Sequence, residues 1–194
     1  MKIKTIICFV LGGGLIVLLF FLTTYKQIAY ISFDEGGYNI EVKWEIPKYK
    51  IKDKEIPQYI PLDEHFKVDE ILHGDFTNNG NEDLAIYLWK RGNYGYDLPF
   101  WIQENDNSYK QHLFVYEQID RLNYRSVWNS SNLPYINKKT ILTDLDNDGL
   151  NEIVVIEQPY DSALRNIAVW QWDDWGFKNI WRSRSGNFAD LKLQ

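Results

Sequence analysis

Residues 143–156 read Thr143-Asp144-Leu145-Asp146-Asn147-Asp148-Gly149-Leu150-Asn151-Glu152-Ile153-Val154-Val155-Ile156. The first part of this stretch is polar and rich in aspartate, and the last part is a continuous apolar run. A run this short and this rich in β-branched residues is typical of a strand that is buried on both faces. We therefore expect an acidic turn that leads directly into a central strand of a β-sheet.

The acidic residues before this strand have the spacing of a Ca²⁺-binding loop. Ca²⁺ prefers six to eight oxygen ligands, which a short loop supplies when acids alternate along it and a glycine permits a sharp bend. The predicted ligands are the side chains of Asp144, Asp146, Asp148 and Glu152 and the backbone carbonyl of Leu150, with Gly149 at the bend. Four carboxylates at one bend repel each other unless a cation lies among them. An ordinary hairpin turn needs only one or two such residues.

This loop differs from an EF-hand. An EF-hand has a bidentate glutamate at its twelfth position and a helix on each side. Here the twelfth position is Val155, in the middle of the predicted strand. The sequence therefore predicts a tighter loop between two strands.

A second polar stretch, residues 74–83, precedes another apolar run, Leu84-Ala85-Ile86-Tyr87. The residues at the corresponding loop positions are Asp75, Thr77, Asn79, Asn81 and Asp83, with Gly80 at the bend. Only two of these side chains are charged, and Ca²⁺ affinity falls with the charge of the ligands. A metal site and a purely structural turn therefore remain alternatives for this loop.

The similarity between the two segments continues after the strands. Leu113-Phe114-Val115-Tyr116 corresponds to Ile167-Ala168-Val169-Trp170, and Trp128 corresponds to Trp181. A repeat of this length is typical of stacked sheet units. We predict two β units within residues 72–194, at about 72–132 and 138–194.

The two units resemble the FG-GAP and VCBS-like repeats, which are the calcium-loop blades of the integrin α-subunit propeller family. The resemblance is carried by residues 144–149 with Glu152-Ile153-Val154-Val155, and more loosely by residues 75–86. It implies four-stranded propeller blades, Ca²⁺ loops that brace each blade, and a role in adhesion or ligand binding. Because two copies alone do not close a ring, the expected fold is mainly β, with antiparallel units like two propeller blades.

Residues 27–71 are predicted to form a hairpin followed by a connector. Residues 38–46 alternate strictly between apolar and polar side chains, which indicates a half-buried strand. The strand-like stretch 29–33 and the turn residues Asp34-Glu35-Gly36-Gly37 precede it. The prolines and lysines between Pro47 and Pro61 favour an extended connector.

Residues 1–26 contain an apolar run from Thr5 to Leu22, which is long enough to span a bilayer as a helix. No small-residue cleavage site ends it, so we expect an uncleaved single-pass anchor, with secretion after signal cleavage as the alternative. The lysines before the run place the C-terminal domain outside the cytoplasm.

The formal net charge of −6 argues against a nucleic-acid partner, because phosphate binding needs clustered Lys and Arg. The leading prediction is a membrane-anchored, calcium-binding module that binds another protein. A glycan or cell-wall binder is the second hypothesis, since Trp170 and Trp172 share one strand face. A hydrolase is the third and has least support, because none of the three histidines stands in a catalytic motif.

Overall fold

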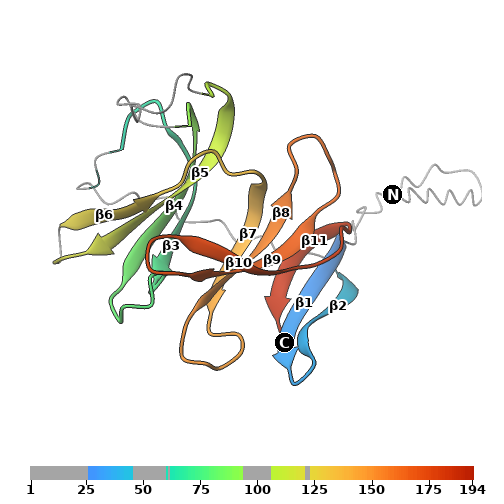
Figure 1. The fold of residues 1–194 in the computed structure, drawn as a ribbon. Coiled ribbons are helices and arrows are strands. Elements are labelled where there is room, and N and C mark those ends of the chain that lie inside the picture. The colour runs from blue at the N-terminus through green and yellow to red at the C-terminus, as the bar shows by residue number, and fades with distance from the viewer. Residues whose placement is uncertain (1–25, 46–59, 61, 94–105, 121–122) are drawn as a thin grey trace, which may run out of the picture.

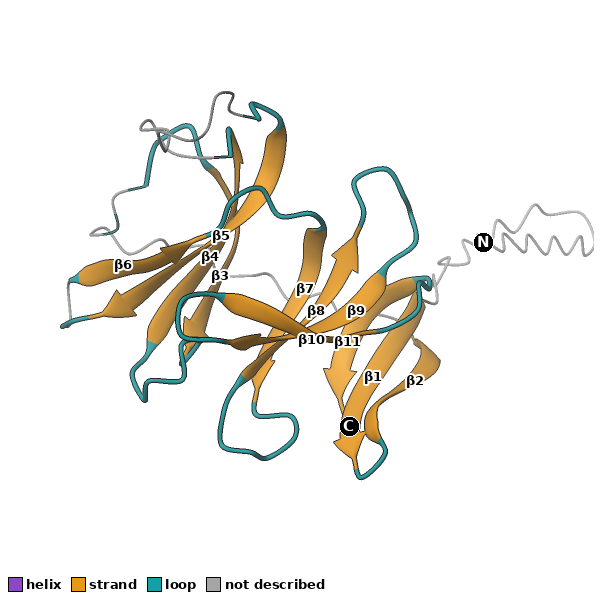
Figure 2. Ribbon diagram, in the orientation of Figure 1, coloured by secondary structure: helices purple, strands orange, loops and turns teal. Residues whose placement is uncertain are grey.

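The computed structural model describes residues 26–45, 60, 62–93, 106–120 and 123–194. Every regular element within these ranges is a strand (Figures 1 and 2). The strands are β1 (Lys26–Asp34), β2 (Gly37–Glu45), β3 (Lys67–Gly74), β4 (Asp83–Arg91), β5 (Tyr109–Gln118), β6 (Tyr124–Asn129), β7 (Ile136–Thr143), β8 (Glu152–Gln158), β9 (Asn166–Trp172), β10 (Phe177–Arg182) and β11 (Phe188–Leu193).

Eight of these strands form two antiparallel sheets in which each strand pairs with the next one along the chain. The first meander has the order β3-β4-β5-β6, and the second meander has the order β7-β8-β9-β10. We call residues 75–83 the first loop and residues 144–152 the second loop. Each loop joins the first strand of its meander to the second, so the two loops occupy equivalent positions.

The remaining three strands form a terminal sheet with the order β11-β1-β2. The predicted hairpin is present, because β1 and β2 pair antiparallel with Asp34 opposite Gly37 at the turn. Strand β11 lies on the other side of β1 and runs parallel to it, so the N-terminal and C-terminal strands are neighbours (Figure 1). The predicted second unit included these C-terminal residues, and no local pattern in the sequence indicates that they pair with β1.

The second meander lies between the other two sheets, and its side chains alternate between two cores. Val154 and Ile156 of β8 pack with Ala29 and Ile31 of the terminal sheet. Ile153 and Val155, which point the opposite way, pack with a cluster from the first meander that includes Tyr87. This double burial explains why β8 is a continuous apolar run, as predicted.

The first meander is also covered on both faces. Ala85 and Tyr87 of β4 face the second meander. Leu84, Ile86 and Leu88 belong to a third core cluster, against which Ile60, Leu62 and Phe66 pack. Most of the predicted connector between Pro47 and Pro61 lies outside the described residues.

The prediction of an N-terminal transmembrane helix is corrected. Among the described residues there is no helix that is long and apolar enough to cross a membrane. Lys26, the last residue of the predicted anchor, is already the first residue of strand β1. The apolar run from Thr5 to Leu22 lies outside the described residues. The structure therefore supports a mainly β fold of three open sheets, and it does not support the single-pass membrane localisation.

Candidate metal site

The second loop folds back on the side chain of its first residue. The carboxylate of Asp144 accepts hydrogen bonds from the backbone N–H groups of Asp148 and Gly149, at 3.1 and 3.0 Å. Asn147 and Gly149 have φ angles of 61° and 90°. Asparagine and glycine tolerate this left-handed region better than other residues, so the local sequence permits the tight turn.

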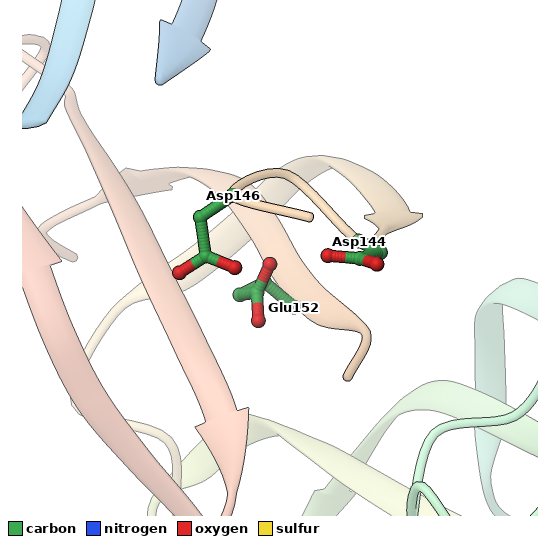
Figure 3. Close-up of side chains that lie close together, drawn as sticks. All are labelled: Asp144, Asp146 and Glu152. Atoms are coloured by element: carbon green, nitrogen blue, oxygen red, sulfur yellow. The ribbon is translucent and has the colours of Figure 1, made fainter. Parts of the chain in front are cut away.

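Three of the predicted ligands converge. Asp144, Asp146 and Glu152 each offer a carboxylate oxygen, and these oxygens lie within 4.8 Å of one another. Figure 3 shows the three carboxyl groups gathered at the loop, where it leads into β8. Ligands of one Ca²⁺ ion, at ~2.3 to 2.6 Å from it, are at most about 5 Å apart. The spacing of the three oxygens therefore fits a single Ca²⁺ ion.

The other two predicted ligands are not part of this group. Asp148 is exposed, and one of its carboxylate oxygens accepts a hydrogen bond of 2.8 Å from the backbone N–H of Leu150. Leu150 is 40% exposed at the edge of the loop. The convergent group is therefore smaller than the predicted set of five, and it includes the acid that begins β8.

Glu152 is the buried member of the group, with no accessible surface. Its carboxylate accepts hydrogen bonds from the backbone N–H of Leu145, at 2.8 Å, and from the side-chain amide of Gln171, at 3.0 Å. Burial raises the pKa of Glu152 above its ordinary value, and the charges of Asp146 and Asp148 raise it further. A divalent cation beside these carboxylates would oppose both effects.

The N-terminal hairpin lies close enough to the second loop for the acidic side chains of that loop to shift the pKa of a hairpin residue. Burial raises the pKa of Tyr38 on β2 to about 12, and the carboxylates of Glu152, Asp146 and Asp148 contribute to that rise. Tyr38 and Leu145 also pack against the same core cluster. The sequence separation of more than one hundred residues hid this proximity.

The first loop has the same backbone shape as the second. The carboxylate of Asp75 accepts hydrogen bonds from the N–H groups of Asn79 and Gly80, at 3.1 and 2.9 Å. Asn78 and Gly80 have φ angles of 56° and 84°. The two loops therefore share their geometry position by position, although their side chains differ.

Asp83 is the buried acid of the first loop, and one of its two carboxylate oxygens, Oδ1, is buried without a hydrogen-bond partner among the described residues. The other oxygen, Oδ2, accepts hydrogen bonds from the backbone N–H of Phe76, at 3.0 Å, and from the N–H and hydroxyl of Thr77, both at 2.9 Å. Burial raises the pKa of Asp83, the bonds from Thr77 and Phe76 oppose that rise, and the charge of Asp75 adds to it. In the part of the chain that the structure describes, no third acidic side chain joins Asp75 and Asp83 in a metal-sized group.

Glu117 of β5 is a neighbour of the first loop that the sequence reasoning missed. One of its carboxylate oxygens accepts hydrogen bonds from the side-chain amides of Asn79 and Asn81, at 3.2 and 3.3 Å. Glu117 lies opposite Asp83 in the β4–β5 register, as Gln171 lies opposite Glu152 in the β8–β9 register. Extending the alignment of the two units by one residue beyond Tyr116 and Trp170 would have found both.

The two loops are joined by a pair of asparagines. The side chain of Asn78 donates to the backbone carbonyl of Asn151, at 3.2 Å, and accepts from its backbone N–H, at 2.6 Å. The side chain of Asn151 donates in turn to the backbone carbonyl of Asp75, at 3.1 Å. These bonds connect the first meander to the residue that precedes Glu152.

We predict that Asn78→Gly lowers the free energy of unfolding by about 1–3 kcal/mol, because two partly buried backbone groups lose their partner. Glycine keeps the positive φ of this position, and the backbone entropy that glycine adds to the unfolded chain is measured by a matched glycine variant. Asn147→Gly is the matched control, since Asn147 has the same loop position and a φ of 61° but is exposed. Equal urea midpoints for the two variants would contradict the prediction.

The fold and the loop thus define a β-sheet protein with a cluster of carboxylates at the start of a central strand. No family model, curated protein or solved structure matches this chain.

Proposed function

We propose that this chain is a calcium-binding β module that binds another protein, with the second loop as its metal site. The observation that carries the proposal is the convergence of Asp144 and Asp146 on the buried carboxylate of Glu152. Three carboxylates this close, one of them fully buried, carry an electrostatic cost that a divalent cation removes. Oxygen ligands alone favour Ca²⁺ over the softer transition metals.

The first loop is proposed as a structural turn that braces the metal loop. The side-chain amides of Asn79 and Asn81 donate hydrogen bonds to the carboxylate of Glu117. Their N–H groups, which do not bind a cation, therefore face this carboxylate. The fourth residue of the first loop, Asn78, holds the backbone of Asn151 next to Glu152. The second loop, which has more acidic side chains, is thus proposed as the metal site, and the first loop, which has fewer, as the turn that supports it.

The edge of the terminal sheet supports a protein partner. Among the described residues, β2 pairs with β1 alone, so its other side has no strand beside it. Val42 and Trp44 on this strand are 42% and 61% exposed. An edge strand with exposed apolar side chains is a surface that another chain covers by adding a strand or packing against it.

The glycan-binding alternative is less well supported than a protein partner. The indole N–H of Trp170 donates to Glu157 at 2.9 Å, and Trp172 packs edge-to-face with Phe177 at 5.2 Å between ring centroids. Both tryptophans are partly buried, so they do not form a free stacking platform. Trp175 is 82% exposed, but it stands at the tip of the β9–β10 turn.

The hydrolase alternative also finds little support. Glu157 is the only carboxylate among the described residues that line the pocket between the two meanders. It is paired with Arg182, whose Nη2 atom lies 2.9 Å from it. Acid–base hydrolysis of the glycosidase type needs two free carboxyl groups that face one substrate.

Calorimetric titration of the metal-stripped chain with CaCl₂ tests the metal site directly. We expect saturable binding with a dissociation constant no weaker than ~1 mM, and weaker binding of Mg²⁺, which demands octahedral geometry and dehydrates reluctantly. Glu152→Gln should abolish the Ca²⁺ signal, because it removes the buried charge at the centre of the group. A wild-type titration without saturable binding up to millimolar Ca²⁺ would refute the proposed site.

A further inference from the structure

Strand β2 is an edge of the terminal sheet and carries an apolar stripe along one face. Among the residues that the structure describes, only β1 pairs with it, and it lies on the outer side of that sheet in Figure 1. Tyr38 and Ile40, near its beginning, pack against the core cluster shared with the second meander. Val42 and Trp44, on the same face of the strand, are 42% and 61% exposed. The second half of the stripe is therefore open to solvent.

The backbone groups on the free side of β2 belong to these apolar residues. Asp34 and Gly37 are opposite each other across a two-residue turn, so they form the hydrogen-bonded pair that closes the hairpin. Hydrogen-bonded and non-hydrogen-bonded pairs alternate along an antiparallel ladder, so every second residue of β2, counted from Gly37, bonds to β1. The N–H and C=O groups of Ile40, Val42 and Trp44 therefore point away from β1, toward the free edge.

The charges on the other face of β2 select one register for a second copy of the same strand. Glu41 and Lys43 form an exposed ion pair at 3.0 Å within the strand. When Val42 lies opposite Val42 of the second copy, Glu41 of each copy lies opposite Lys43 of the other. These opposite charges are then in non-hydrogen-bonded pairs, where side chains approach each other most closely. Opposite charges in such pairs stabilise a sheet.

The neighbouring registers are unfavourable. The two that also bring the outward backbone groups face to face place Glu41 opposite Glu41, or Lys43 opposite Lys43. Like charges that lie directly opposite each other destabilise a sheet. The lysine on this edge therefore does not exclude a second copy, but it restricts that copy to a single alignment.

The same register covers the apolar stripe. Ile40 of each copy lies opposite Trp44 of the other, and the two copies of Val42 lie side by side on the same face. Each contact occurs twice, because an antiparallel pair of identical strands has two-fold symmetry. Tryptophan is enriched at the centres of protein interfaces, and Trp44 is 61% exposed in the single chain.

We propose that β2 pairs antiparallel with β2 of a second copy of this chain, which joins two terminal sheets into one sheet of six strands. This inference rests on the protein-binding edge of the proposed function and names its partner. The metal site is not required, because no residue of β2 belongs to the group of three carboxylates. A single strand pair is a small interface, so we expect a reversible dimer with a dissociation constant on the order of 10 μM.

Sedimentation velocity of the full chain over a range of concentrations tests the pairing. Wild type is expected to show a reversible equilibrium between monomer and dimer. Val42→Pro should abolish the dimer, because proline removes the N–H that the second copy needs. This N–H points away from β1, so the hairpin tolerates the change, as edge strands do. Circular dichroism and the melting temperature verify that the variant is folded.

Charge reversal tests the register independently of the backbone. Glu41→Lys and Lys43→Glu each place like charges opposite one another, so each variant alone should self-associate at least ~10-fold more weakly. An equimolar mixture of the two variants should dimerise as wild type does, because each charge of one copy then meets its opposite on the other. Lys178→Glu is the matched control, since it reverses an exposed lysine on β10, the edge of another sheet.

Three results would overturn the proposal, namely a wild type that stays monomeric up to ~1 mM, a folded Val42→Pro variant that still dimerises, or a mixture of the charge variants that stays monomeric. The charge variants change exposed side chains, so they decide the question even if Val42→Pro does not fold. A monomeric wild type that shows saturable Ca²⁺ binding refutes the dimer alone. A dimer that binds no Ca²⁺ refutes the metal site and supports the pairing of the two edges.

Discussion

Saturating Ca²⁺ is expected to raise the melting temperature of the full chain by about 5–10 °C, and Asp146→Asn is expected to abolish most of this rise. A ligand present at about 100 times its dissociation constant adds about 2.7 kcal/mol to the stability of the folded state. For a chain of this length, 1 kcal/mol corresponds to about 2–4 °C. Differential scanning calorimetry with CaCl₂ and with a chelator measures the effect.

Without metal, the Asp146→Asn variant should not be less stable than wild type. Asp146 and Glu152 repel each other in the metal-free loop, so a neutral amide at residue 146 should leave the melting temperature unchanged or raise it slightly. Asp161→Asn removes an acid that is exposed on another turn, and it should keep the full Ca²⁺ response. If Asp146→Asn responds to Ca²⁺ as strongly as wild type does, the three-carboxylate site is wrong.

The second large effect is expected at the buried ion pair between Glu157 and Arg182. Arg182→Ala should lower the free energy of unfolding by about 2–4 kcal/mol, because it leaves the Glu157 carboxylate buried with Trp170 as its remaining hydrogen-bond donor. This figure is below that for a fully buried pair, since the Arg182 side chain is 32% exposed. Arg184→Ala changes an exposed arginine two residues further on and should cost little.

The pH dependence of the Arg182→Ala variant identifies the cause of its instability. Burial raises the pKa of Glu157 above its ordinary value of 4.5, and Arg182 opposes that rise. Without Arg182 the folded-state pKa rises further, so the protonated carboxyl is favoured in the folded state. The stability of the variant should therefore be nearest to wild type below pH 4.5, and it should fall as the pH rises through the raised pKa.

The double variant Glu157→Gln/Arg182→Ala provides the control for this interpretation. A neutral amide at residue 157 removes the buried charge, so the double variant should regain part of the stability and lose the pH dependence. Chemical denaturation at several pH values measures both. A penalty for Arg182→Ala that is constant across pH would assign the loss to the contact with Tyr135 instead.

Local patterns in the sequence predicted the features that depend on neighbouring residues. The apolar run Ile153–Ile156 identified a doubly buried strand, because such a run needs a protein layer on each face. The spacing of the second loop identified three acids that converge. The same spacing predicts Asp148 as a ligand. In the structure one oxygen of its carboxylate accepts a hydrogen bond from the backbone N–H of Leu150, a local bond that spacing alone does not reveal, and its role as a ligand stays a prediction.

The features that the sequence did not reveal depend on residues far apart in the chain. Tyr38 lies near the acids of the second loop because the terminal sheet packs on the second meander. Asn78 bonds to Asn151 across 73 residues. The pairing of β11 with β1 has no local signal, since β11 has the composition of an ordinary short strand. Such contacts depend on how the three sheets pack on one another, and the spacing of apolar residues along the sequence does not specify that packing.

The pairing of β1 with β11 also bears on how the chain folds during synthesis. Strand β1 is the central strand of the terminal sheet, and its partner Phe188–Leu193 leaves the ribosome more than 150 residues later. One edge of β1 in the β1–β2 hairpin therefore stays unpaired while both meanders are translated. Closure of so long a loop is an intrinsically slow step. Emergence of β11, rather than of the first strands, is then the event that completes the terminal sheet.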